Sequence, residues 1–140
     1  MELPFLETGV EINAPADAAW LVITDTRLWS EWRPTIVAVE TDERFIRLGS
    51  KGWISTVAGM RLPFVITEYE PGRRWRWAVG GIPAIGHRVE PIDPARCRMM
   101  FEVPILAAAY LPLCRVAAVR IRRLLDNSDL TDAGAMHQEV

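Results

Sequence analysis

Hydrophobic and polar residues alternate through the middle of the chain, between regularly spaced turn signals. Gly, Pro and Asp residues mark turns at 49–50, 59–63, 71–72, 80–83 and 93–94. The stretches between them predict strands near 36–47, 51–58, 63–70, 73–80, 85–92 and 96–103, with a further strand near 7–13. Because the connections are short, we expect about seven strands that pair antiparallel.

Three of these strands alternate cleanly enough for their faces to be assigned. In the strand 73–80, Trp75 and Trp77 fall on one face, while Arg74 and Arg76 fall on the other. The face shared with the tryptophans also carries Val79, Ile85, His87, Val89, Cys97, Met99, Phe101 and Val103. The opposite face carries Arg88, Glu90, Arg96, Arg98 and Glu102. The pattern predicts that the aromatic residues and His87 point inward and that the arginines cover a solvated outer face.

Two short helices are predicted between the first strand and the rest of the sheet. Asn13 is a suitable N-cap, and Pro15 fits the first turn of a helix that carries Trp20 on its apolar face. Asp25 can cap a second short helix, which Pro34 ends.

A long helix is predicted within 105–127. Its apolar residues recur at spacings of three and four, and Pro112 either kinks it or marks the start of a second helical piece. The polar segment 128–140 lacks periodicity and is expected to be a disordered tail, so residues 1–127 form the single predicted domain.

Composition narrows the function classes without naming a function. The chain has 140 residues and a formal net charge of −2, which gives no reason to expect a nucleic-acid partner. Its two cysteines form no metal-binding or disulfide pattern. The N-terminus lacks a basic segment followed by an apolar run, so no signal peptide is expected. The longest uncharged apolar run, 103–114, is too short to span a bilayer, and a cytoplasmic location is expected.

Several phrases occur in an order that is similar to a known group of proteins. They are Ile12-Asn13-Ala14-Pro15 with Trp20, the turn from Trp29 to Pro34, the segment from Tyr69 to Trp77, and Gly86-His87-Arg88. Over about residues 5–125 the chain resembles the SRPBCC/START-like superfamily, in particular its polyketide cyclase–dehydrase group. The resemblance implies an α+β helix-grip (START/Bet v 1-like) fold, in which a curved antiparallel sheet wraps the C-terminal helix around a hydrophobic cavity. It implies no common catalytic residue and no cofactor.

His87 is the only candidate catalytic residue, since His137 lies in the predicted tail. An inward imidazole can act as acid or base near neutral pH, or it can be a neutral core residue with one hydrogen-bond partner. If Pro91 imposes a bulge that shifts the register by one residue, Glu102 would lie opposite His87. The candidate ligand-binding residues are Trp53, Tyr69, Trp75, Trp77, His87, Met99, Phe101, Tyr110 and Leu113. We expect Trp75, Trp77 and His87 to line a pocket of roughly 300–1,000 Å³.

Three functions fit this pattern. The leading hypothesis is a protein that binds a hydrophobic small molecule, lipid-, aromatic- or polyketide-like, between the sheet and the C-terminal helix. One alternative is a cofactor-independent cyclase or dehydratase that uses His87. The other is a co-chaperone-like protein interaction module, which a sealed core would favour. The sequence leaves the oligomeric state open and predicts no metal site.

Overall fold

The computed structural model describes the backbone of residues 5–138 and the side chains of residues 5–126 other than Leu106. The elements are β1 (Phe5–Ile12), α1 (Ala16–Thr24), η1 (Thr26–Leu28), α2 (Trp29–Trp32), β2 (Ile36–Glu40), β3 (Lys51–Thr56), β4 (Arg61–Glu70), β5 (Arg74–Val79), β6 (Ile82–Asp93), β7 (Arg96–Pro104), η2 (Ile105–Tyr110) and α3 (Leu111–Gln138). All seven strands form one antiparallel sheet in the order β1-β7-β6-β5-β4-β3-β2. This confirms the predicted helix-grip architecture.

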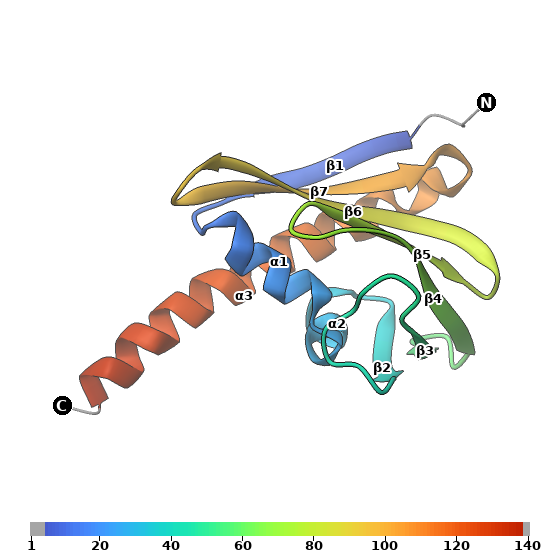
Figure 1. Ribbon diagram of the computed structural model, residues 1–140, viewed down its shortest axis with the longest axis horizontal. Helices are drawn as coiled ribbons and strands as arrows, with labels where there is room; N and C mark the ends of the chain where they lie inside the picture. Colours follow the sequence, from blue (N-terminus) through green and yellow to red (C-terminus); the bar gives the residue numbers. More distant parts are fainter. Residues whose placement is uncertain (1–4, 139–140) are drawn as a thin grey trace.

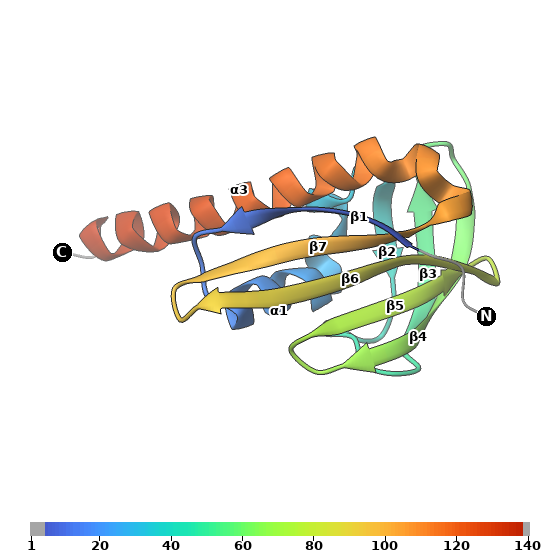
Figure 2. The ribbon, with the colours of Figure 1, turned by 90° about the horizontal axis from the view of Figure 1, so that it is seen from above.

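The sheet curves so that its inner face holds the helices (Figure 1). The long helix α3 runs beside β1, as the view from above shows (Figure 2). The short helix α2 packs between α3 and β2, and α1 packs against β6 and β7. The two short helices therefore occupy the inner side of the sheet together with α3. No helix among the described residues is long and apolar enough to cross a membrane.

The starts of the short helices differ from the prediction in one respect. The N-cap of α1 is Pro15, whose carbonyl accepts from the N–H groups of Ala18 and Ala19 at 3.1 and 3.3 Å, and no side chain caps this end. The prediction that Asn13 is the N-cap is therefore wrong, because Asn13 lies two residues before Pro15, the observed cap. Asp25 is confirmed as a cap, since its carboxylate accepts from the N–H of Arg27 at 3.0 Å.

The C-terminal helix begins later and extends further than predicted. A 3₁₀ turn, η2, precedes it, and the backbone of Ala107 leaves helical geometry, so Pro112 stands in the first turn of a second helical piece. The backbone of α3 is helical to Gln138, beyond the predicted end at residue 127. Side chains from residue 127 onward lie outside the described residues, and the disordered tail at 128–140 stays a prediction.

The pairing of β6 with β7 settles the register around Pro91. His87 lies opposite Phe101, and Gly86 lies opposite Glu102. The irregularity that Pro91 introduces falls between Pro91 and Asp93, at the far end of the strand. The alternative register that would bring Glu102 to His87 is therefore wrong, and Glu102 points to the outer face of the sheet.

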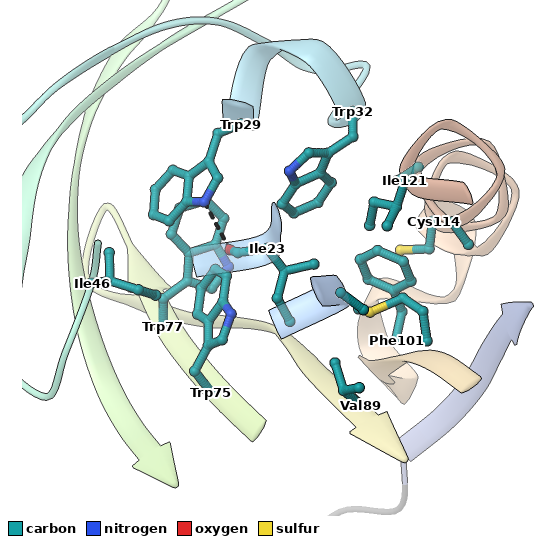
Figure 3. Packing of buried hydrophobic residues seen from close by; sticks show 14 of the residues in the cluster. Ile23, Trp29, Trp32, Ile46, Trp75, Trp77, Val89, Phe101, Cys114 and Ile121 are labelled. Atoms are coloured by element: carbon teal, nitrogen blue, oxygen red, sulfur yellow. Dashed lines mark hydrogen bonds between the residues drawn. The ribbon is translucent and has the colours of Figure 1, made fainter. Parts of the chain in front are cut away.

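The inner face carries a dense aromatic core. Trp75, Trp77, His87, Met99 and Phe101 are all buried, which confirms the predicted alternation in these strands. The remaining space is filled by Trp29 and Trp32, which project from α2 toward β5 and β7 (Figure 3). The indole N–H of Trp29 donates to the carbonyl of Ile23 at 3.0 Å, which fixes α2 against α1.

Candidate functional site

The end of α2 places an arginine inside the core. Arg33 caps α2 in an extended conformation, and its N–H donates to the carbonyl of Trp29 at 2.9 Å. Pro34 follows and cannot continue the helix, so the chain leaves toward β2 at this point. The Arg33 side chain remains beneath α2, where only 7% of its surface is exposed.

Two aromatic rings and one imidazole surround the Arg33 guanidinium. Its Cζ lies 4.9 Å from the ring centroid of Trp32 and 4.8 Å from that of Trp77. One terminal nitrogen donates a hydrogen bond to Nε2 of His87, while Nε has no hydrogen-bond partner among the described atoms. Rings at this distance attract a cation through their negative faces. We call Arg33, Trp32, Trp77 and His87 the guanidinium cage.

No carboxylate of the described residues balances the charge of Arg33. Arg33 takes part in none of the ion pairs formed within residues 5–126. Burial lowers the pKa of Arg33 to about 10, which still leaves the guanidinium charged at neutral pH. The neighbouring thiol of Cys114 is not an anion under these conditions, because burial raises its pKa. The cage therefore holds a cation that has no counter-ion among residues 5–126.

His87 is fully enclosed in the cage, with no exposed surface. Its ring stacks on Trp75 with centroids 3.8 Å apart and meets the edge of Phe101 at 5.3 Å. Burial holds the pKa of His87 well below 6.5, and the charge of Arg33 lowers it further. A guanidinium can only donate, so Nε2 of the neutral ring accepts and Nδ1 carries the proton. His87 is thus a neutral acceptor that orients Arg33.

A small pocket opens at the cage between the sheet and α3. Its volume is about 20 Å³, and its walls are Arg33, Pro34, Thr35, Ile85, Phe101, Tyr110, Leu113, Cys114 and Ala117. This is far smaller than the pocket of several hundred Å³ that we predicted. The physical reason is that the tryptophans of α2 fill the space: Trp29 stacks on Trp75 at 5.4 Å and meets Trp77 edge-on at 5.2 Å.

The predicted ligand-binding residues separate into three groups. Phe101, Tyr110 and Leu113 line the pocket. Trp75, Trp77, His87 and Met99 are buried in the core cluster or the cage. The other two lie apart from the pocket: Tyr69 packs against Trp20 at 5.7 Å, and Trp53 lies on the outer face of the sheet with 40% of its surface exposed.

Trp53 belongs to a second feature, an open groove on the outer side of β3 and β4. The groove has a volume of about 1030 Å³ and includes Trp53, Arg61, Pro63 and Val65 in its walls. The guanidinium of Arg61 covers the Trp53 ring at 4.1 Å and also pairs with Glu40 at 3.0 Å. From the sequence we expected Trp53 at the ligand pocket, but its neighbour Ile54 takes the buried position on β3 and Trp53 faces outward.

The sequence reasoning missed Arg33 as a site residue. The available signal was the position of Arg33 between Trp32 and Pro34, the proline that ends the helix. These residues belong to the Trp29–Pro34 turn on which the family resemblance partly rests. Within the part of the chain that the structure describes, no cluster of His, Cys, Asp and Glu side chains is placed to hold a metal ion.

The chain matches one known protein family over most of its length. The profile of the family described as polyketide cyclase/dehydrase and lipid transport matches residues 6–127. The chain belongs to this family. Membership supports a ligand-binding or cyclase role and leaves the ligand open. No curated protein matches the chain.

Solved structures share the fold at low sequence identity. XoxI from Bacillus cereus has a TM-score of 0.67 at 10% identity, with 87% of this chain and 95% of that chain covered. The hypothetical protein jhp0584 from Helicobacter pylori has a TM-score of 0.71 at 14% identity, with 86% of each chain covered. The di-domain ARO/CYC BexL from the BE-7585A biosynthetic pathway has a TM-score of 0.66 at 15% identity, covering 90% of this chain and 47% of BexL. At these identities the similarity establishes the fold alone.

Proposed function

We propose that this protein binds a hydrophobic small molecule between the sheet and α3, at the pocket where the guanidinium cage meets Phe101 and Leu113. The observation that carries the proposal is the buried charge of Arg33, which lines this pocket and has no carboxylate partner among the described residues. Burying a charge is unfavourable unless something compensates it. Membership of the polyketide cyclase/dehydrase and lipid transport family supports a role of this kind.

The pocket must enlarge to admit such a ligand, because about 20 Å³ has room for little more than one water molecule. The wall most suited to move is η2 with the first turn of α3. Tyr110 and Leu113 line the pocket from this segment and are partly exposed, with half of the Tyr110 surface accessible. The helical geometry already breaks at Ala107. A displacement of this segment would open a path from solvent to Arg33.

A fluorescence titration with N-phenyl-1-naphthylamine, a neutral apolar probe, tests this proposal. We expect saturable one-site binding to the wild type. Ala117→Leu should weaken it about tenfold or more, because the added carbons occupy the pocket that Ala117 lines. Val116→Leu on the exposed side of the same helix is the matched control and should bind like the wild type. Absence of saturable binding, or equal binding in Ala117→Leu at wild-type thermal stability, would contradict the proposal.

Two alternatives draw on separate observations. A cyclase or dehydratase would use His87 as acid or base, and its support is the neutral imidazole next to a cation that could polarise a carbonyl. In that case His87→Ala abolishes turnover and leaves affinity nearly unchanged. A protein interaction module is favoured by the nearly closed interior and by the outer groove around Trp53. In that case Trp53→Ala abolishes partner binding and leaves the binding of N-phenyl-1-naphthylamine unchanged.

A further inference from the structure

The guanidinium cage contains donors without matching acceptors. Among the described residues, Nε of Arg33, the indole nitrogens of Trp32 and Trp77, and Nδ1 of His87 are buried and have no hydrogen-bond partner. The one hydrogen bond that the guanidinium forms with a described residue is its donation to Nε2 of His87. Buried polar groups in folded proteins are nearly always paired, so four unpaired donors in and around one cation require an explanation. Arg33 is the member of the cage that lines the pocket, and a group that satisfies its guanidinium from the pocket has to accept hydrogen bonds.

The shape of the site adds a second constraint. The guanidinium offers five N–H donors in one plane, and such a fork matches the two oxygens of a carboxylate. The rest of the pocket wall is mainly apolar, with Ile85, Phe101, Leu113 and Ala117 among its members. The pocket therefore has one cationic end and a hydrocarbon-like body.

Within the part of the chain that the structure describes, no group supplies the missing negative charge. His87 faces the guanidinium from β6 but is neutral, because burial and the nearby cation hold its pKa far below 6.5. Cys114 faces it from α3 and stays a thiol, because burial raises its pKa. Glu102, which follows Phe101 on β7, points to the outer face, where it pairs with other arginines. Within the described residues, the counter-ion of Arg33 has to come from outside the chain.

We propose that the ligand of this pocket is an apolar acid whose carboxylate pairs with Arg33 while its hydrophobic body lies against Phe101 and Leu113. This inference rests on the proposed function and narrows it to one chemical class. Trp32 and Trp77 hold the guanidinium between their rings, and His87 is a positioning residue that fixes its orientation.

The test compares two probes of nearly equal shape, 2-naphthoate and 2-naphthalenemethanol, by calorimetric titration at pH 7. In the wild type we expect naphthoate to bind at least about tenfold more tightly, since hydrogen bonds to a charged group are the stronger kind. In Arg33→Met the naphthoate affinity should fall by about that factor, and the alcohol should change by less than about threefold. Arg61→Gln, a change in the outer groove, is the control and should keep the wild-type preference.

The outcomes separate this inference from the function on which it rests. If both probes bind the wild type equally, the assignment of an acid is wrong and the pocket remains a binding site for neutral molecules. If neither binds and N-phenyl-1-naphthylamine does not bind either, the proposed function itself is wrong. The preference in the wild type is measured without any substitution, so the test stands even if Arg33→Met fails to fold.

Discussion

The arginines on the two faces of the sheet differ in how their charge is compensated. On the inner face, Arg33 is caged by aromatic rings and lacks a carboxylate partner among the described residues. On the outer face, Arg74, Arg76 and Arg88 all bind one carboxylate, that of Glu102, at 3.1, 2.8 and 2.7 Å. We call these four residues the Glu102 clamp.

The clamp is balanced by further acids at its border. Arg76 pairs with Glu68 at 3.3 Å, and Arg88 pairs with Glu7 at 2.7 Å. On the outer face, where arginines tie strands together, carboxylates of the chain compensate their charge. At the pocket, the charge of Arg33 has no carboxylate partner among the described residues. Both arrangements contain buried charge, so burial alone does not distinguish a structural arginine from one that is available to a ligand.

The largest expected effect comes from breaking the clamp. Glu102→Gln should lower the free energy of unfolding by about 3 kcal/mol, because three guanidinium groups would then lose the one buried carboxylate that they share and keep only the more exposed acids at its border. Urea unfolding at pH 7 measures this. A loss below about 1 kcal/mol would show that the clamp is an ordinary surface network.

The pH dependence of unfolding in the same variant provides a control. Burial by itself raises the pKa of Glu102, but the hydrogen bond from Arg76 and the three positive charges outweigh it, so the pKa lies below 4.5. A carboxyl whose folded pKa is lowered stabilises the fold above its unfolded pKa and stops doing so as the pH falls. The difference between the wild type and Glu102→Gln should therefore shrink as the pH falls below 4.5.

A smaller effect is expected from the neutral imidazole in the cage. Since His87 has its pKa lowered on folding, the unfolded chain binds the extra proton below about pH 6.5 and the fold loses stability there. The unfolding free energy of the wild type should fall by about 2 kcal/mol more than that of His87→Gln between pH 6.5 and 5. Parallel pH profiles for the two proteins would contradict a buried neutral histidine.

The smallest effect on stability is expected at Arg33 itself. Arg33→Met removes two cation–π contacts and leaves His87 without its donor, but it also removes a buried charge that costs free energy to desolvate. These terms oppose each other, so the free energy of unfolding should change by less than about 1.5 kcal/mol. A loss of about 3 kcal/mol or more in thermal or urea unfolding would make Arg33 a structural residue.

The sequence was sufficient for the fold and for the two faces of β5, β6 and β7, because alternation along a strand is a local property. It placed His87 inward for the same reason. It was insufficient for the cavity, because the volume depends on how Trp29 and Trp32 fill the space across from β5, and no local pattern reports that packing.

The two charged sites show the same limit. Glu102 was predicted on a wet surface, yet only 8% of it is exposed, because three arginines of β5 and β6 cover it. They can do so because residue 86, opposite Glu102, is a glycine: a Cβ there would lie 2.7 Å from Glu102 Oε1 and 3.0 Å from Arg76 Nε. Arg33 was overlooked because the element that buries it is a single turn, α2, whose position is set by contacts with α3 and β2.

The most direct test of the contrast between the two faces is a paired measurement on Arg33→Met and Arg76→Met. Each variant is unfolded in urea and titrated with 2-naphthoate at pH 7. We predict that Arg33→Met loses about tenfold or more in naphthoate affinity while its free energy of unfolding changes by less than about 1.5 kcal/mol. Arg76→Met should lose about 2 kcal/mol of stability and keep its affinity. The reverse pattern, with stability lost at Arg33 and affinity lost at Arg76, would contradict the account.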